Sequence, residues 1–180
     1  MRLKVVDIPS EGFDLTAKSA GDPWFAAILA DAFREDWQRE AAFLQLHILK
    51  TCENVSVTGK AEVSLHPTCA RCLVSFRHPL SIPVEITLVP HREKQAKEGE
   101  EVELVEEDLN FAFYRGGTID LADIVREFLL LAIPFRYLCS EKCRGICPKC
   151  GANRNEKQCD CRPTSTDPRF AALKNFKAGH

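Results

Sequence analysis

The feature that most constrains this chain is its cysteine cluster: residues 138–161, LCSEKCRGICPKCGANRNEKQCDC, hold six of its nine cysteines. Thiols at this density indicate disulfide bonds, a redox-active dithiol or a metal. A chain of 180 residues can bury a core without disulfides. Its first residues, MRLKVVDIPSEGF, contain no apolar stretch of signal-peptide length, and no segment approaches the roughly 20 apolar residues of a membrane span. We therefore expect a reducing cytoplasm, where clustered cysteines indicate metal binding or catalysis.

The tightest group of cysteines predicts a structural zinc site. CPKCG has the form of a zinc knuckle, in which two sulfurs separated by two residues reach one ion across a tight turn. Gly151 permits the left-handed backbone that such a turn needs, and the loop GANRNEKQ returns the chain to CDC. The predicted ligands of this first site are Cys147, Cys150, Cys159 and Cys161.

A second site is predicted from the count of the remaining cysteines. Setting Cys52 aside as a small apolar core residue leaves eight, which is two tetrahedral shells. The second shell would combine Cys69 and Cys72, from HPTCARCLVSF, with Cys139 and Cys143, although 66 residues separate the two pairs. The alternative is that the first pair consists of half-buried thiols at strand ends. We expect one or two zinc ions, with iron–sulfur ligation as the alternative for an all-cysteine shell.

Catalysis is the less favoured use of these thiols. A thioredoxin-like dithiol belongs at a strand-to-helix junction, where the helix N-terminus lowers the pKa of the first thiol. CARC instead lies between two runs with strand periodicity, and CPKC lies in a loop rich in Gly and Asn. The chain also shows no Ser-His-Asp order, no phosphate-binding glycine loop and no paired carboxylates in apolar surroundings. We therefore predict a protein that is not an enzyme, and keep a thiol redox sensor as an alternative.

The rest of the chain predicts an α+β fold. Residues 41–50, 55–65 and 80–90 alternate apolar and polar side chains, the pattern of half-buried strands joined by short connections. They predict an antiparallel β-meander or a partly closed barrel, packed with two or three helices. Helical spacing places helices near residues 22–35 and 120–132, and a short third helix in TDPRFAALKNF. We divide the chain into a β-rich body, residues 1–135, and a basic zinc-binding module, residues 136–180.

Charge separates these two parts. Residues 136–180 contain ten Lys and Arg against four acids, whereas residues 1–135 contain 14 against 22. A compact basic module on an acidic body suits contact with phosphates. The alternative is that these charges serve solubility and balance the thiolates. Four basic residues near the cysteines are the predicted RNA contacts: Arg144, Lys149, Arg154 and Arg162. A run of eight carboxylates and two lysines, residues 93–108, is interpreted as a solvated loop.

Four motifs occur in order between residues 40 and 177: TCARCL, GGTIDLADIVREFLLLAIP, LCSEKCRGICPKCGANRNEKQCDC and DPRFAALKNF. Together they resemble the YceD-like family, described as large-subunit ribosomal RNA accumulation proteins. The resemblance implies a bacterial cytoplasmic or plastid protein needed for normal levels of that RNA. It matches Cys69 and Cys72 to the family's CxxC and the other six clustered cysteines to a longer tail that some members lack. Arg154 departs from the apolar residue expected at its position.

These observations predict a non-enzymatic ribosome biogenesis factor that supports accumulation of 23S ribosomal RNA. It would bind ribosomal RNA or a large-subunit ribosomal protein through the zinc-stabilised basic module. The alternative from another class is an acidic adaptor, in which the body, and residues 93–108 above all, holds a basic ribosomal protein before assembly. We expect no association with membranes.

Overall fold

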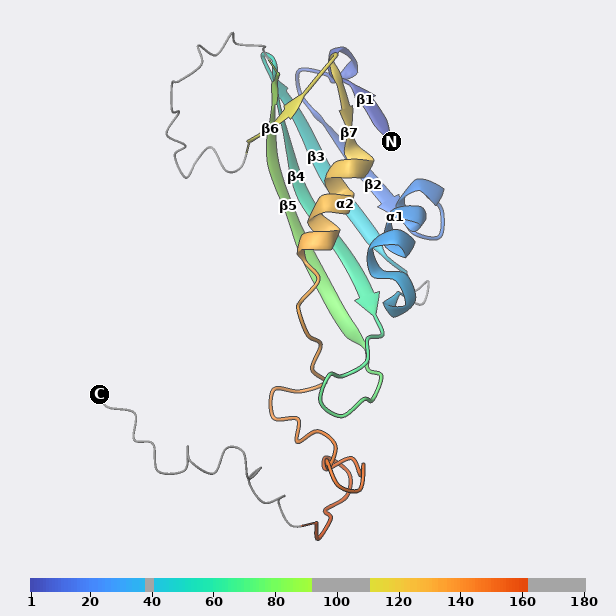
Figure 1. The fold of residues 1–180 in the computed structure, drawn as a ribbon. Helices are drawn as coiled ribbons and strands as arrows, with labels where there is room; N and C mark the ends of the chain where they lie inside the picture. The colour runs from blue at the N-terminus through green and yellow to red at the C-terminus, as the bar shows by residue number, and fades with distance from the viewer. Residues whose placement is uncertain (38–40, 92–110, 162–180) are drawn as a thin grey trace, which may run out of the picture.

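The computed structural model describes residues 1–37, 41–91 and 111–161. One five-stranded sheet, in the order β2-β3-β4-β5-β6, forms a layer with two helices in front of it (Figure 1). Its strands are β2 (Phe13–Lys18), β3 (Phe43–Thr51), β4 (Asn54–Leu65), β5 (His78–Pro90) and β6 (Phe111–Tyr114). The helices are α1 (Pro23–Phe33) and α2 (Leu121–Leu131), and short 3-10 turns span Val5–Asp7 and Arg34–Asp36. A second sheet pairs β1 (Arg2–Lys4) with β7 (Thr118–Asp120) directly before α2.

The antiparallel meander is confirmed for four consecutive strands, β2 to β5. The sheet is open, so the alternative of a partly closed barrel is wrong: within the described residues, the edge strands β2 and β6 do not pair with each other. β6 also pairs with β5 in parallel, over Thr87–Pro90, whereas the predicted meander contained only antiparallel pairs. Pro83 pairs with Lys60 on β4 and lies outside the part of β5 that pairs with β6, so it occupies an edge position of the described sheet, where proline is tolerated.

One face of the sheet forms the core, because alternate strand residues point to the same side. Leu44, Leu46 and Ile48 of β3 are fully buried, and Val55 and Val57 of β4 lie beside them. The same cluster includes the apolar sides of both helices: Phe25, Ile28, Leu29 and Phe33 from α1, and Leu121, Ile124, Val125 and Leu129 from α2. The helices predicted near 22–35 and 120–132 are therefore present, with ends within two residues of the prediction.

Gly59 allows β4 to pass close to β3 without a break in the strand. A Cβ atom built at this position would overlap the carbonyl oxygen of Gln45 on the neighbouring strand β3. Only glycine allows the two backbones to approach this closely while the ladder continues on both sides.

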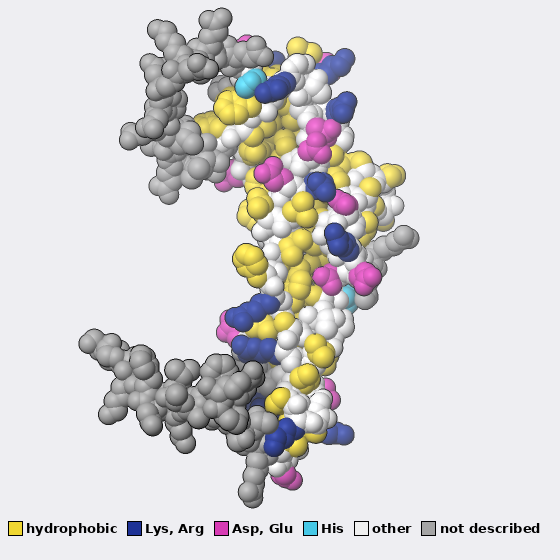
Figure 2. Space-filling view, in the orientation of Figure 1, with side chains coloured by type: hydrophobic (Ala, Val, Ile, Leu, Met, Phe, Trp, Pro, Cys, Tyr) yellow, Lys and Arg dark blue, Asp and Glu magenta, His cyan; other side chains and the backbone are white. Residues whose placement is uncertain are grey.

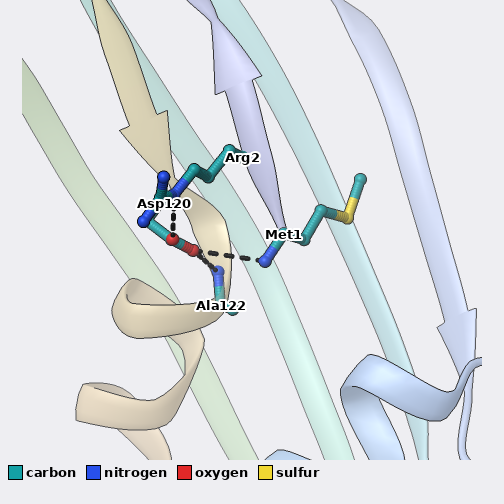
Figure 3. A network of polar contacts seen from close by, with 4 residues as sticks. All are labelled: Met1, Arg2, Asp120 and Ala122. Atoms are coloured by element: carbon teal, nitrogen blue, oxygen red, sulfur yellow. Dashed lines mark hydrogen bonds and ion pairs between the residues drawn. The ribbon is translucent and has the colours of Figure 1, made fainter. Parts of the chain in front are cut away.

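Asp120 begins α2 and joins it to β1 (Figure 3). Its carboxylate accepts a hydrogen bond from the backbone N–H of Ala122 at 3.1 Å, which caps the helix. It also forms ion pairs with Arg2 and with the amino group of Met1, each at 3.3 Å. Partial burial raises the pKa of this carboxyl, but the two cationic partners and the Ala122 N–H together lower it below its ordinary value.

Beyond α2, the chain runs past the end of the sheet into the cysteine-rich segment, next to the connection between β4 and β5 (Figure 1). The predicted third helix in TDPRFAALKNF and the acidic run at residues 93–108 lie outside the described residues. Among the described residues, no helix has the length and apolar character needed to cross a bilayer.

Candidate metal centre

The fold brings eight cysteines together in two groups of four, and within each group all sulfur atoms lie within 4.8 Å of one another. The first tetrad consists of Cys69, Cys72, Cys139 and Cys143, and the second tetrad of Cys147, Cys150, Cys159 and Cys161. These are the two groups that the sequence suggested. In the first tetrad, the Cys69 and Cys143 sulfurs are 3.8 Å apart and those of Cys72 and Cys139 are 3.6 Å apart, although each pair is separated by more than 60 residues in sequence.

The turn between β4 and β5 supplies half of the first tetrad. The backbone N–H of Cys69 donates to the carbonyl of Val74, and the N–H of Leu73 donates back to the carbonyl of Cys69, both at 2.9 Å. A β-bridge between Thr68 and Ser75 closes the turn. Leu73 follows the second cysteine with a left-handed backbone, φ 61°, and its side chain is 62% exposed. The turn thus directs both sulfurs to one point at the end of the sheet.

The second tetrad begins with a turn that has the same hydrogen-bond pattern. The Cys147 N–H donates to the Ala152 carbonyl and the Gly151 N–H donates to the Cys147 carbonyl, both at 2.8 Å. A bridge between Ile146 and Asn153 closes this turn, and Gly151 has φ 71°, as predicted for this glycine. The chain therefore builds one knuckle geometry twice. Only the second copy has glycine at the left-handed position, which is why the sequence indicated it more clearly.

The CARC turn is held against the chain that follows α2 by a set of backbone contacts. The Ala70 N–H donates to the carbonyl of Tyr137, and the Ile146 N–H donates to the carbonyl of Arg71, both at 2.9 Å. The Arg71 guanidinium donates to the carbonyls of Glu141 and Cys143, each at 3.1 Å. Sequence reasoning missed this role of Arg71. The one signal in the sequence was the position of Arg71 between Cys69 and Cys72. A residue there lies beside whichever segment supplies the other two cysteines of the site.

The electrostatics of both tetrads favour a bound cation. The N–H of Cys139 is the main cause that lowers the pKa of the Cys69 thiol to about 6, and the N–H groups of Cys150 and Lys149 lower that of Cys147 to about 6. In each tetrad another thiol is affected in the opposite direction. The neighbouring sulfur of Cys72 raises the pKa of Cys139 to about 12.

The same effect occurs in the second tetrad, where the neighbouring Cys150 raises the pKa of Cys161 to about 12. Four thiols this close cannot all ionise together unless a cation offsets their charge. Four sulfurs of this softness suit zinc or an iron–sulfur cluster. The donor set therefore fits a metal at each tetrad.

Burial differs between the two tetrads. Cys69, Cys72 and Cys143 are buried and form a small apolar cluster with Phe76 and Leu138. In the second tetrad only Cys147 is buried. The first tetrad is thus joined to the packed body, and the second lies closer to solvent.

Cys52 lies outside both groups. It is exposed in the turn between β3 and β4, with φ 57°, so its interpretation as a small core residue is wrong. The two-residue turn requires a left-handed backbone here, and the side chain points to solvent. Its exposure makes Cys52 a useful control position.

Three of the predicted RNA contacts, Arg144, Lys149 and Arg154, are exposed near the tetrads, and Arg162 lies outside the described residues. Residues 66–77 and 136–161 contain eight Lys and Arg against three acids. Eight thiolates and two dications would subtract four charges from this balance of +5 and leave +1. On the face shown in Figure 2, basic and acidic side chains of the described residues are interspersed. The local field around a metal-loaded module is therefore modest.

Comparison with known proteins agrees with the motifs. The sequence profile of the family described as large ribosomal RNA subunit accumulation protein YceD matches residues 57–177. This chain belongs to the YceD family. The matched span includes all eight cysteines of the two tetrads, both turns and α2. It also includes β5 and most of β4, so the family's shared region is the part of the fold that brings the two halves of the first tetrad together.

Relatives of the chain occur in distant organisms. The YCED homolog 1, a chloroplastic large ribosomal RNA subunit accumulation protein of Arabidopsis thaliana, is 36% identical over 59 residues, which is 33% of this chain and 18% of the relative. YlbN of Bacillus subtilis is 32% identical over 109 residues, or 60% of this chain and 58% of YlbN. Rv2926c of Mycobacterium tuberculosis is 29% identical over 133 residues, or 72% and 59%. The chain thus spans less than two thirds of each of these relatives. No solved structure matches it.

Proposed function

We propose that this chain is a non-enzymatic assembly factor that supports accumulation of 23S ribosomal RNA, and that its two tetrads bind zinc. Membership of the YceD family, whose description names accumulation of the large ribosomal RNA subunit, is the observation that carries the proposal. The metal-binding region would contact ribosomal RNA or a large-subunit ribosomal protein. Its exposed cations Arg144, Lys149 and Arg154 supply the contacts to phosphate in the first case.

The geometry supports a structural use of the metal. A tetrad of four cysteines fills all four positions of a tetrahedral ion, whereas a catalytic zinc keeps one position open for water or substrate. An ion in the first tetrad would fasten the CARC turn to the segment after α2, and one in the second would shape the loop between Cys150 and Cys159. Both ions would then present a rigid surface at the end of the sheet.

The role in the cell is tested by deleting the gene for this chain and measuring the ratio of 23S to 16S ribosomal RNA. We expect the ratio to fall and to recover when the parent protein or Cys52→Ser is supplied. The double variant Cys69→Ser with Cys72→Ser should not restore it. An unchanged ratio after deletion would refute the proposed role, and full recovery with the double variant would refute the need for the first tetrad.

Contact with RNA is tested by the salt dependence of binding to fragments of 23S ribosomal RNA. Each phosphate contact releases counterions, so the affinity should fall steeply with salt. Arg144→Ala, Lys149→Ala and Arg154→Ala should each reduce the slope by about 0.7 to 1. A flat response in the metal-loaded parent would refute binding of this region to RNA phosphates.

One observation favours the adaptor as a second candidate. Without residues 66–77, which contain the CARC turn, the described part of residues 1–135 carries 13 acids against eight Lys and Arg, a balance of −5. Such a surface suits a basic ribosomal protein. Capture of large-subunit proteins should weaken when the eight carboxylates of residues 93–108 are replaced by amides. Equal capture by parent and variant would count against the adaptor.

A further inference from the structure

One side chain connects the two tetrads. Asn155 lies in the loop between the second and third cysteines of the second tetrad, yet its Nδ2 group donates a hydrogen bond to the sulfur of Cys143 in the first tetrad, 3.3 Å away. Its Oδ1 atom accepts the backbone N–H of Arg144, next to that cysteine, at 2.8 Å. Asn155 therefore contacts the sulfur of a cysteine in the other group and the backbone of the residue that follows this cysteine.

The position of Asn155 depends on the fold of its own loop. Asn153 Oδ1 accepts hydrogen bonds from the backbone N–H of Asn155 at 3.1 Å and from its Nδ2 group at 2.8 Å. Asn153 is in turn held by the β-bridge to Ile146 and by a bond to Glu156 at 2.7 Å. The position of the Asn155 side chain therefore depends on the folded second knuckle, in which the four sulfurs of the second tetrad lie close together.

The second tetrad also supports the first through the backbone. The Arg154 N–H donates to the carbonyl of Gly145 at 2.9 Å, and Gly145 follows the Cys143–Arg144 pair. Groups that donate hydrogen bonds to metal ligands orient those ligands and disperse their charge, and their loss typically lowers metal affinity 10–100-fold. An amide N–H directed at a thiolate sulfur is such a group.

We infer that Asn155 is a positioning residue that couples the two metal centres, so that folding of the second tetrad around its ion delivers the amide that completes the first. The inference rests on the proposed binding of metal by both tetrads. Coupling between two binding sites is reciprocal, so each ion raises the affinity for the other by the same factor. The parent protein should therefore load its two ions cooperatively.

The test uses the full chain, with zinc affinity measured by competition with a chromophoric chelator. The variants are Asn155→Ala and Asn155→Asp, and the matched controls are the same substitutions at Asn54, which is exposed at the end of β4 opposite the two tetrads. Asn155→Ala should weaken one site by about 10–100-fold and abolish cooperative loading. Alkylation at limiting chelator, read by mass spectrometry, should label Cys139 and Cys143 first in this variant.

The aspartate variant separates the two bonds that Nδ2 donates, to Cys143 and to Asn153, from the bond that Oδ1 accepts from the Arg144 N–H. It keeps an oxygen acceptor for the Arg144 N–H but replaces the N–H donor to Cys143 with a second oxygen. The inference expects it to lose at least as much affinity as the alanine variant. A shift of the sulfur-to-metal charge-transfer band in the cobalt-loaded variant is a second readout, which a purely structural role would leave in place.

The outcomes are distinct. Parent-like affinity in Asn155→Asp with a loss in Asn155→Ala would show that Asn155 acts only through its bond to the Arg144 N–H, and would overturn the inference. Parent-like behaviour of both variants would overturn it as well. A parent protein that binds no zinc or cobalt would instead refute the proposed metal binding, together with any coupling that depends on it.

Discussion

Replacing Gly145 with alanine probes how closely the CARC turn packs on the segment after α2. Gly145 has φ +70°, a left-handed conformation that costs a residue with a side chain about 1–2 kcal/mol. A Cβ atom here would also lie 2.9 Å from the carbonyl oxygen of Arg71. That oxygen accepts the Ile146 N–H, so it cannot retreat without losing a hydrogen bond. Overpacking of this kind adds about 1–3 kcal/mol, for a total of about 2–5 kcal/mol.

Gly151 provides the matched control. Its φ is +71°, and a Cβ atom there would meet nothing within 4 Å. Gly151→Ala should therefore cost only the strain of the left-handed backbone, about 1–2 kcal/mol. The free energies of unfolding would be measured by urea denaturation in zinc-saturated buffer. A larger loss for Gly145→Ala is the expected result. Equal losses for the two variants would refute the close contact between Gly145 and Arg71.

Three further predictions concern the body and the first knuckle. Asp120→Ala should destabilise the protein by about 1 kcal/mol through loss of the helix cap, whereas Asp120→Asn should lose the ion pairs only. Because the folded pKa of Asp120 is lowered, its charge stabilises the fold above its unfolded pKa and this contribution disappears as pH falls through the folded pKa. The urea midpoints of parent and Asp120→Asn should therefore converge in acid, and a pH-independent gap would contradict the ion pairs. Gly59→Ala should cost about 3 kcal/mol or more because its Cβ would overlap the Gln45 carbonyl, and a parent-like thermal midpoint would argue against the close strand approach. Leu73→Gly should stabilise the fold by about 0.5–1 kcal/mol, since relief of the left-handed backbone exceeds the entropy cost of glycine; a clear loss of stability would indicate that the exposed leucine packs.

Local patterns explain most of what could be predicted from the sequence. Leu44, Leu46 and Ile48 alternate with polar neighbours, and that period places them on one face of a strand wherever the strand lies. The cysteine grouping was also predictable, because four ligands per ion is a constraint on number and needs no knowledge of the fold. The pairing of residues 69–72 with residues 139–143 followed from that count once the close spacing of CPKCG and CDC had assigned the other four cysteines to one site.

Features set by long-range contacts could not be predicted in this way. β6 carries only four residues, FAFY, and nothing in them indicates parallel pairing with β5. Whether the sheet closes depends on how its edges meet, which no single segment encodes. Cys52 was misassigned because a small apolar residue is usually buried, whereas its position in a tight hairpin turn places it in solvent.

The first tetrad also changes the topology of the chain. An ion that joins Cys69 to Cys143 would close a ring of about 75 residues that contains β5, β6, β7 and α2. Closing a ring of this length with a covalent bond removes enough freedom from the unfolded chain to stabilise the native state by about 4 kcal/mol. A metal–thiolate link of comparable persistence would act in the same way on the sheet and on α2. Removal of the metal would then open this ring and lower the free energy of unfolding by the same amount.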